Sequence, residues 1–206
     1  MKNALLILAI LLSAGCVKHV PDAIIDKLPY EARIELLEAE NDLALAVDRL
    51  DEASNEWLRT RDLIRRAKDR LKAADKEVSN AVDTLSREVA QLAVTEADAR
   101  VEYLRAKQKV NVLEEDLAKL FLTCAYTRFE QSKLTAARKA KLEGSESLDP
   151  AEFENAVKVC DEKHAAAKAA MKDTEGEATT LRSAWDATKE KLAKKTFDAR
   201  ASPYVE

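Results

Sequence analysis

LLEAENDLALAVDRLDEASNEWLRTRDLI, residues 36–64, places a large apolar side chain at every seventh position, beginning at Leu36. The repeat continues in the same phase to Leu134, through Leu36, Leu43, Leu50, Trp57, Ile64, Leu71, Val78, Leu85, Leu92, Ala99, Ala106, Leu113, Leu120, Thr127 and Leu134. Only Thr127 is polar. A seven-residue apolar repeat of this length is typical of a helix that packs along another helix in a coiled coil. The chain is therefore predicted to be all-α.

A row of small side chains accompanies the first half of this repeat. It lies three residues after the large residues and consists mostly of alanine: Ala39, Ala46, Ala53, Ala67, Ala74 and Ala81. Small side chains let a neighbouring helix approach closely. We call the large residues from Leu36 to Val78, together with these alanines, the Leu/Ala stripe. We expect it to bind a second copy of the chain or another protein.

The repeat is expected to lie on one continuous helix over 30–142. No glycine or proline, the residues that interrupt helices, occurs between Pro29 and Gly144. Gly144 lies in a charged segment, 143–149, that is expected to form a loop.

A second helix is predicted over 150–199. Asp149 suits the N-cap and Pro150 suits the first helical position. This helix carries its own seam of apolar, small and weakly polar residues at alternating spacings of four and three: Phe153, Val157, Cys160, His164, Ala167, Met171, Thr174, Ala178, Leu181, Trp185, Thr188 and Leu192. The predicted fold is a long antiparallel coiled-coil helical hairpin in which the first helix is much longer than the second.

The lengths of the two helices leave an alternative open. A helix over 30–142 extends roughly 170 Å, and a second helix in a hairpin covers only its last 50 or so residues. A break near 79–81, where Ser79 and Asn80 lie, gives an elongated three-helix bundle instead. The continuous helix is favoured because the repeat crosses residues 78–85 without a change of phase.

Residues 1–16, MKNALLILAILLSAGC, have the layout of a secretory signal. Lys2 precedes an uncharged apolar run over residues 4–12, and small residues precede Cys16. A run this short cannot cross the hydrocarbon layer of roughly 30 Å, which takes about 20 helical residues. We expect a signal peptide over 1–15 rather than a membrane span; an ordinary cleaved signal with an incidental cysteine and an uncleaved leader are the alternatives.

The end of this signal resembles the lipobox of bacterial lipoprotein precursors, in which Leu, Ala or Ser, and Gly or Ala precede an invariant Cys. Ala14, Gly15 and Cys16 match, whereas Ser13 stands where the lipobox has Leu. The resemblance implies that Cys16 becomes the mature N-terminus and carries a thioether-linked diacylglycerol and an N-acyl chain such as palmitate. Val17, rather than Asp, follows the cysteine, which by the sorting rule of such lipoproteins implies the outer membrane, facing the periplasm or exposed at the cell surface.

Residues 16–29 hold two of the four prolines and are expected to form a lipidated tether, which reaches about 40 Å when fully extended. Within it, Ile24, Ile25 and Leu28 suggest partial docking, either on lipid headgroups or on the start of the first helix. Residues 200–206 form a short tail.

Cys124 and Cys160 lie on the seams of the two predicted helices. In an oxidising envelope compartment such a pair is expected to form a disulfide, which requires the first helix to end early, around 137–140. Free buried thiols or an intermolecular disulfide are alternatives. A metal site made of Cys160, His164 and Cys124 is a further alternative, but a structural zinc site takes four ligands and no fourth lies on the seam.

Composition argues against most other classes of function. The formal net charge of −4 provides no basic face for nucleic acid. Only three glycines and 5% aromatic residues argue against a globular enzyme with a large core. Carboxylates occur in helix-surface ion pairs such as Asp62/Arg66, and no catalytic or phosphate-binding motif is present. We therefore expect no enzyme activity, cofactor, metal or small-molecule substrate.

Two functions remain. The first is a lipid-anchored, non-enzymatic tether, spacer or scaffold in the bacterial cell envelope. The second is a helical-hairpin binding subunit of an envelope secretion, efflux or motility complex, with the loop around 144–149 or the Leu/Ala stripe as the contact. A membrane-active role is disfavoured because no apolar hairpin follows Cys16.

Overall fold

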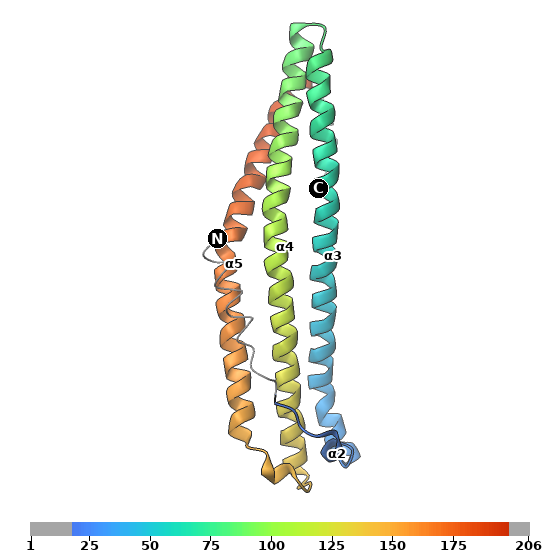
Figure 1. The fold of residues 1–206 in the computed structure, drawn as a ribbon, viewed down its shortest axis with the longest axis vertical. Helices are drawn as coiled ribbons and strands as arrows, with labels where there is room; N and C mark the ends of the chain where they lie inside the picture. Colours follow the sequence, from blue (N-terminus) through green and yellow to red (C-terminus); the bar gives the residue numbers. More distant parts are fainter. Residues whose placement is uncertain (1–17, 198–206) are drawn as a thin grey trace. The chain divides into compact units, whose positions relative to one another are not determined.

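The computed structural model describes residues 18–197, and its regular structure is helical throughout this range (Figure 1). The elements are α2 (Asp22–Ile25), α3 (Tyr30–Asn80), α4 (Thr84–Lys139), the 3-10 helix η1 (Ser145–Ser147) and α5 (Pro150–Thr196). The all-α prediction is confirmed. The predicted signal peptide, Cys16 and the tail over 200–206 lie outside the described residues.

The prediction of one continuous helix over 30–142 is wrong. α3 ends at Asn80, α4 begins at Thr84, and the chain reverses direction over the three residues between them (Figure 1). The alternative with a break near 79–81 places the interruption within two residues of where it occurs. The unbroken phase of the repeat suggested one helix. A short link can keep two separate helices in the same phase by chance, so an unbroken phase does not require an unbroken helix.

The start of α4 is defined by a reciprocal pair of hydrogen bonds. The Ser86 N–H donates to Asp83 Oδ1 at 2.7 Å, and the Asp83 N–H donates to Ser86 Oγ at 3.2 Å. This is a capping box in which serine takes the place that Glu or Gln usually holds. Asp83 three residues before Ser86 was therefore a readable start signal for a new helix.

The described chain divides into two compact units, each containing part of α3, α4 and α5. Unit 1 comprises residues 18–54 and 114–171, and unit 2 comprises residues 55–113 and 172–197. Each unit has its own buried clusters, and each is described separately below.

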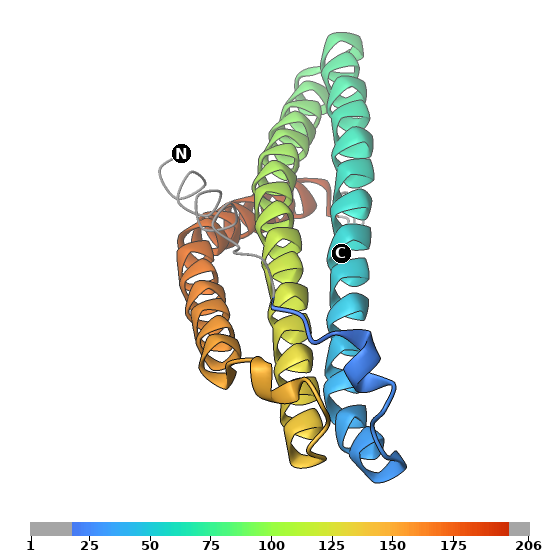
Figure 2. The ribbon, with the colours of Figure 1, turned by 60° about the horizontal axis from the view of Figure 1, so that its bottom comes forward.

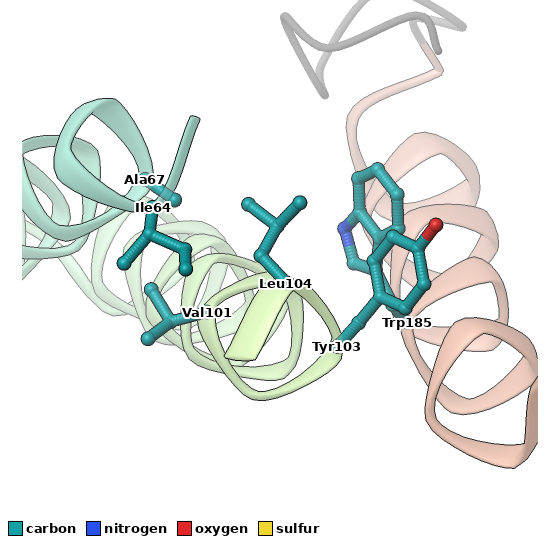
Figure 3. Close-up of a cluster of buried hydrophobic side chains, with 6 residues drawn as sticks. All are labelled: Ile64, Ala67, Val101, Tyr103, Leu104 and Trp185. Atoms are coloured by element: carbon teal, nitrogen blue, oxygen red, sulfur yellow. The ribbon is translucent and has the colours of Figure 1, made fainter. Parts of the chain in front are cut away.

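The core of unit 2 uses two faces of α4. Val101 and Leu104 pack against Ile64 and Ala67 of α3, whereas Tyr103 faces Trp185 of α5, as Figure 3 shows. The rings of Tyr103 and Trp185 stack with their centroids 5.5 Å apart. Trp185 is completely buried, as its place on the predicted seam required. α4 therefore serves as the central helix of this unit.

In unit 2, small residues of the Leu/Ala stripe pack against α4. The sequence had predicted that the stripe would bind another chain. Ala67 and Ala74 are buried, and Ala74 lies in a cluster with Ala93 of α4 and Leu192 of α5. This part of the stripe is internal core. The physical reason is that the reversal at residues 81–83 brings α4 back along α3.

Two buried polar contacts fix the register of the helices in unit 2. Asn111 Nδ2 donates to Thr60 Oγ1 at 2.8 Å and to the Glu56 carbonyl at 3.2 Å. Trp185 Nε1 donates to Glu96 Oε1 at 2.6 Å. A shift of register leaves these buried groups without partners, so they select one alignment of the three helices.

In unit 1, α4 ends at Lys139 and a loop over 140–149 leads to α5 (Figure 2). The loop starts earlier than the predicted 143, at the position that a disulfide was expected to require. Gly144 has a φ of +89°, which suits glycine. The Arg138 side chain donates to three carbonyls of the loop, those of Ser145, Glu146 and Leu148.

The predicted seam of α5 agrees with burial along the helix. Every seam residue from Phe153 to Leu192 is buried or half-buried, including Cys160 and Trp185. The predicted end of this helix at 199 lies outside the described residues, and α5 as described ends at Thr196.

The capping box predicts a pH-dependent contribution to stability. Hydrogen bonds from the Ser86 backbone and hydroxyl hold the pKa of Asp83 below its ordinary value of 3.8. A carboxyl whose pKa is lowered by folding stabilises the fold above its unfolded pKa and loses this contribution as the pH falls through the folded pKa. Asp83→Asn keeps a good N-cap that does not titrate. We expect acidification from about pH 6 to about pH 3 to lower the melting temperature of the wild type more than that of Asp83→Asn, measured by circular dichroism. Equal decreases in the two proteins contradict the prediction.

Candidate anchoring site of the N-terminal segment

Residues 18–29 dock onto unit 1 instead of forming a free tether; we call them the strap. Val20 is 0%, Ile24 8% and Leu28 4% exposed. Their spacing of four places them on one side of the short turn that contains α2. The tether predicted over 16–29 is therefore wrong for the described residues of this range. The docking on the start of the first helix is confirmed for Leu28, whereas Ile24 packs on α4 and α5 instead.

The strap packs mainly on the C-terminal part of α4 (Figure 2). Val20 and Ile24 share a cluster with Leu134, Ala137 and Phe153, of which the last belongs to α5. Leu28 lies in a second cluster with Ala32, Leu36 and Ala136. Burial of side chains of this size contributes about 1.5–3 kcal/mol each. The strap therefore joins all three long helices of unit 1.

A buried carboxylate holds the first residues of the strap. The Glu130 side chain is fully buried, and its Oε2 accepts a hydrogen bond from the Val20 N–H at 2.7 Å. His19 Nδ1 lies 3.2 Å from the same oxygen, and Lys133 Nζ donates to Oε1 at 2.8 Å. Both carboxylate oxygens are thus occupied, as a buried charge requires.

Neighbouring groups extend this polar cluster. The Lys133 ammonium lies 4.5 Å from the centre of the Phe129 ring, a cation–π contact. Burial raises the pKa of Tyr126, and the negative charge of Glu130 raises it further. Lys18, at the start of the strap, forms an ion pair with Glu152 of α5 at 2.8 Å. The strap therefore enters between α4 and α5.

Sequence reasoning missed Glu130 because Glu130 and Lys133 have the spacing of an ordinary helix-surface ion pair. No pattern in the neighbouring sequence distinguishes a carboxylate that a distant part of the chain buries from one that faces water. The readable signal was in the strap, where Val20, Ile24 and Leu28 recur every four residues.

The structure joins Cys124 of α4 to Cys160 of α5 by a disulfide, the pairing that the sequence predicted. The Cα atoms are 5.5 Å apart, and the bond lies in a cluster with Leu120 and Ala167. Cys124 lies 15 residues before the last residue of α4 and Cys160 lies ten residues after the first residue of α5, so the bond joins the two helices away from the loop over 140–149.

The disulfide also excludes the alternative metal site of Cys160, His164 and Cys124. Cys160 is bonded to Cys124 and cannot act as a thiolate ligand beside His164. His164 packs against Phe121, with ring centres 5.6 Å apart. Burial lowers the pKa of His164 below 6.5, and the positive charge of Lys168 lowers it further. This histidine is a half-buried packing residue.

The comparisons with known proteins add no relative: no protein-family model, curated protein or solved structure matches the chain. Between residues 18 and 197, no helix combines the length and apolarity needed to span a bilayer. Within the same range, no group of three His, Cys, Asp or Glu side chains is arranged to hold a metal ion. The strap and its contacts with Glu130 are therefore the most specific arrangement among the described residues.

Removal of the Glu130 carboxylate is expected to loosen the strap. Glu130→Ala leaves the buried Val20 N–H without an acceptor, which costs about 1–3 kcal/mol. Amide hydrogen exchange over residues 18–29 should become faster by the corresponding factor, as measured by mass spectrometry. Glu130→Gln retains an acceptor oxygen and should have a smaller effect. Glu152→Gln, which alters an exposed partner of the strap, is the control; equal exchange in Glu130→Ala and in this control contradicts the prediction.

The disulfide is expected to stabilise the protein through loop closure. The two cysteines are 36 residues apart, and a loop of this length corresponds to about 3–4 kcal/mol in the chain-entropy treatment. The double variant Cys124→Ala/Cys160→Ala should lose this amount of unfolding free energy in urea denaturation. Reductant should reproduce the loss in the wild type and have no effect on the variant. An unchanged midpoint in the variant is the contrary result.

Proposed function

We propose that this protein is a lipid-anchored bacterial envelope protein without enzyme activity, attached through Cys16, that serves as a helical tether, spacer or scaffold. The observation that carries the proposal is the lipobox-like ending of the leader, Ala14-Gly15-Cys16. Its expected location is the outer membrane, facing the periplasm or exposed at the cell surface.

The strap supports processing at Cys16. All of its residues lie downstream of the cysteine, beginning with Lys18. Cleavage before Cys16 therefore preserves the contacts of Val20 with Glu130 and of Lys18 with Glu152. A mature chain that starts at Cys16 retains all of the described helices.

The packing of the long helices supports a mechanical role. Within unit 2, pairs such as Glu56 with Lys107 and Ala74 with Ala93 show residue numbers rising along α3 as they fall along α4. We interpret this as antiparallel coiled-coil packing. Such helices place an apolar seam inside and charged residues outside, which suits a scaffold better than a reaction site.

The second candidate function is a helical binding subunit of an envelope secretion, efflux or motility complex. It is favoured by an exposed apolar row on α3 in unit 1. The row consists of Tyr30 (74% exposed), Ile34 (47%), Leu37 (50%) and Leu45 (55%). Their spacing places all four on one helical face. Exposed apolar rows of this kind mark protein contacts, so this face, rather than the alanines buried in unit 2, is where a second copy or a protein partner would bind.

Lipidation is tested by metabolic labelling with an alkyne analogue of palmitate in a bacterial host. The wild type should incorporate the label and float with membranes in a detergent-free gradient, and Cys16→Ser should lose the label completely. The double variant Cys124→Ala/Cys160→Ala is the matched control and should remain labelled. Label in Cys16→Ser, or its absence from the wild type, contradicts a lipid-anchored function.

A further inference from the structure

The chain between the proposed lipid and the docked strap is short. Cys16 lies two residues before Lys18 and four before Val20. Because a fully extended chain spans at most about 3.6 Å per residue, the Cα of Cys16 lies within about 7 Å of that of Lys18 and about 14 Å of that of Val20. Val20 is held by buried Glu130, and Lys18 forms an exposed ion pair with Glu152.

The start of the strap lies beside the first turn of α5, at Glu152, and beside Glu130 of α4. Glu130 lies nine residues before the last residue of α4, Lys139. At 1.5 Å per residue this is about 14 Å along the helix axis. The contact of Lys18 with Glu152 directs the chain to the side of α5. Chain length therefore keeps a lipid attached at Cys16 near the first turn of α5 and the adjoining side of α4.

One surface of α5 lies beside this point. Glu152 and Val159 are seven residues apart and share one helical face. Val159 is an exposed apolar residue, 38% accessible. We call the surface formed by Lys18, Glu152 and Val159 the exit face.

We propose that the strap clamps the lipidated N-terminus to the flank of unit 1, so that the exit face rests against the headgroups of the bilayer. The proposal rests on lipidation of Cys16, the proposed function. Its partner is the lipid surface, because acyl chains attached at Cys16 enter the bilayer within the reach of two residues from Lys18. Without the strap, a tether of residues 16–29 would allow the helical body to move about 40 Å from the membrane.

The test uses the full-length lipidated protein in vesicles of phosphatidylethanolamine and phosphatidylglycerol. The photocrosslinker p-benzoylphenylalanine replaces Val159 in one variant and Leu45, an exposed residue of α3 in the same unit, in the matched control. After illumination, mass spectrometry measures the fraction of each variant that carries a phospholipid adduct. We expect adducts at position 159 to exceed those at position 45 several-fold.

A second variant tests whether the short link between Cys16 and the strap keeps the exit face at the membrane. An insertion of about 12 Gly and Ser residues between Val17 and Lys18 adds an average reach of about 20 Å while leaving the strap residues and Glu130 unchanged. The insertion should reduce the adducts at position 159 to the level at position 45. Hydrogen exchange over residues 18–29 should remain slow, which shows that the strap is still docked.

The outcomes separate the two proposals. With Cys16 lipidated, three results overturn the membrane-facing exit face. The first is equal adducts at positions 159 and 45, and the second is adducts at 159 that persist after the insertion. The third is crosslinking of position 159 to a second copy of the chain. A protein whose N-terminal peptide carries no lipid by mass, and which does not float with vesicles, overturns the proposed function and this inference with it.

Discussion

Burial of the apolar stripe of α3 is the constraint on which the other features depend. A single helix of this length gains little stability from its own hydrogen bonds and requires a packed face. The reversal at residues 81–83 lets the same chain cover that face, with Ile64 and Ala74 in unit 2 lying against α4. In unit 1, Leu36 meets Ala136 of α4. Without the reversal, the stripe would need another molecule.

Apolar stripes alone leave the register of long helices weakly determined, because a shift by seven residues restores most of their contacts. Buried polar groups remove this degeneracy. In unit 2, Asn111 with Thr60 and Trp185 with Glu96 each pair in one alignment only. In unit 1, Glu130 performs the same role for the strap by accepting from the Val20 N–H. These contacts select an arrangement that hydrophobic burial then stabilises.

The strap and the disulfide reinforce the same unit. The disulfide joins α4 to α5 at Cys124 and Cys160, and Val20 packs between the same two helices nearer the loop. Both devices fasten the part of the molecule that follows the proposed lipid. The strap and the disulfide therefore both hold α4 against α5 in unit 1.

Helix type, the seam of α5 and the cysteine pairing could all be derived from the residues, because periodicity, capping and redox environment act locally or pairwise. The early end of α4 at Lys139 followed from the same logic. The reversal at residues 81–83 could not be derived with equal certainty, since Asp83 and Ser86 form a weak signal and the unbroken phase of the repeat pointed the other way. The docking of the strap and the burial of Glu130 emerged only from the folded chain. They depend on contacts between residues more than a hundred positions apart, and no local pattern distinguishes a charge that such a contact covers from one that faces water.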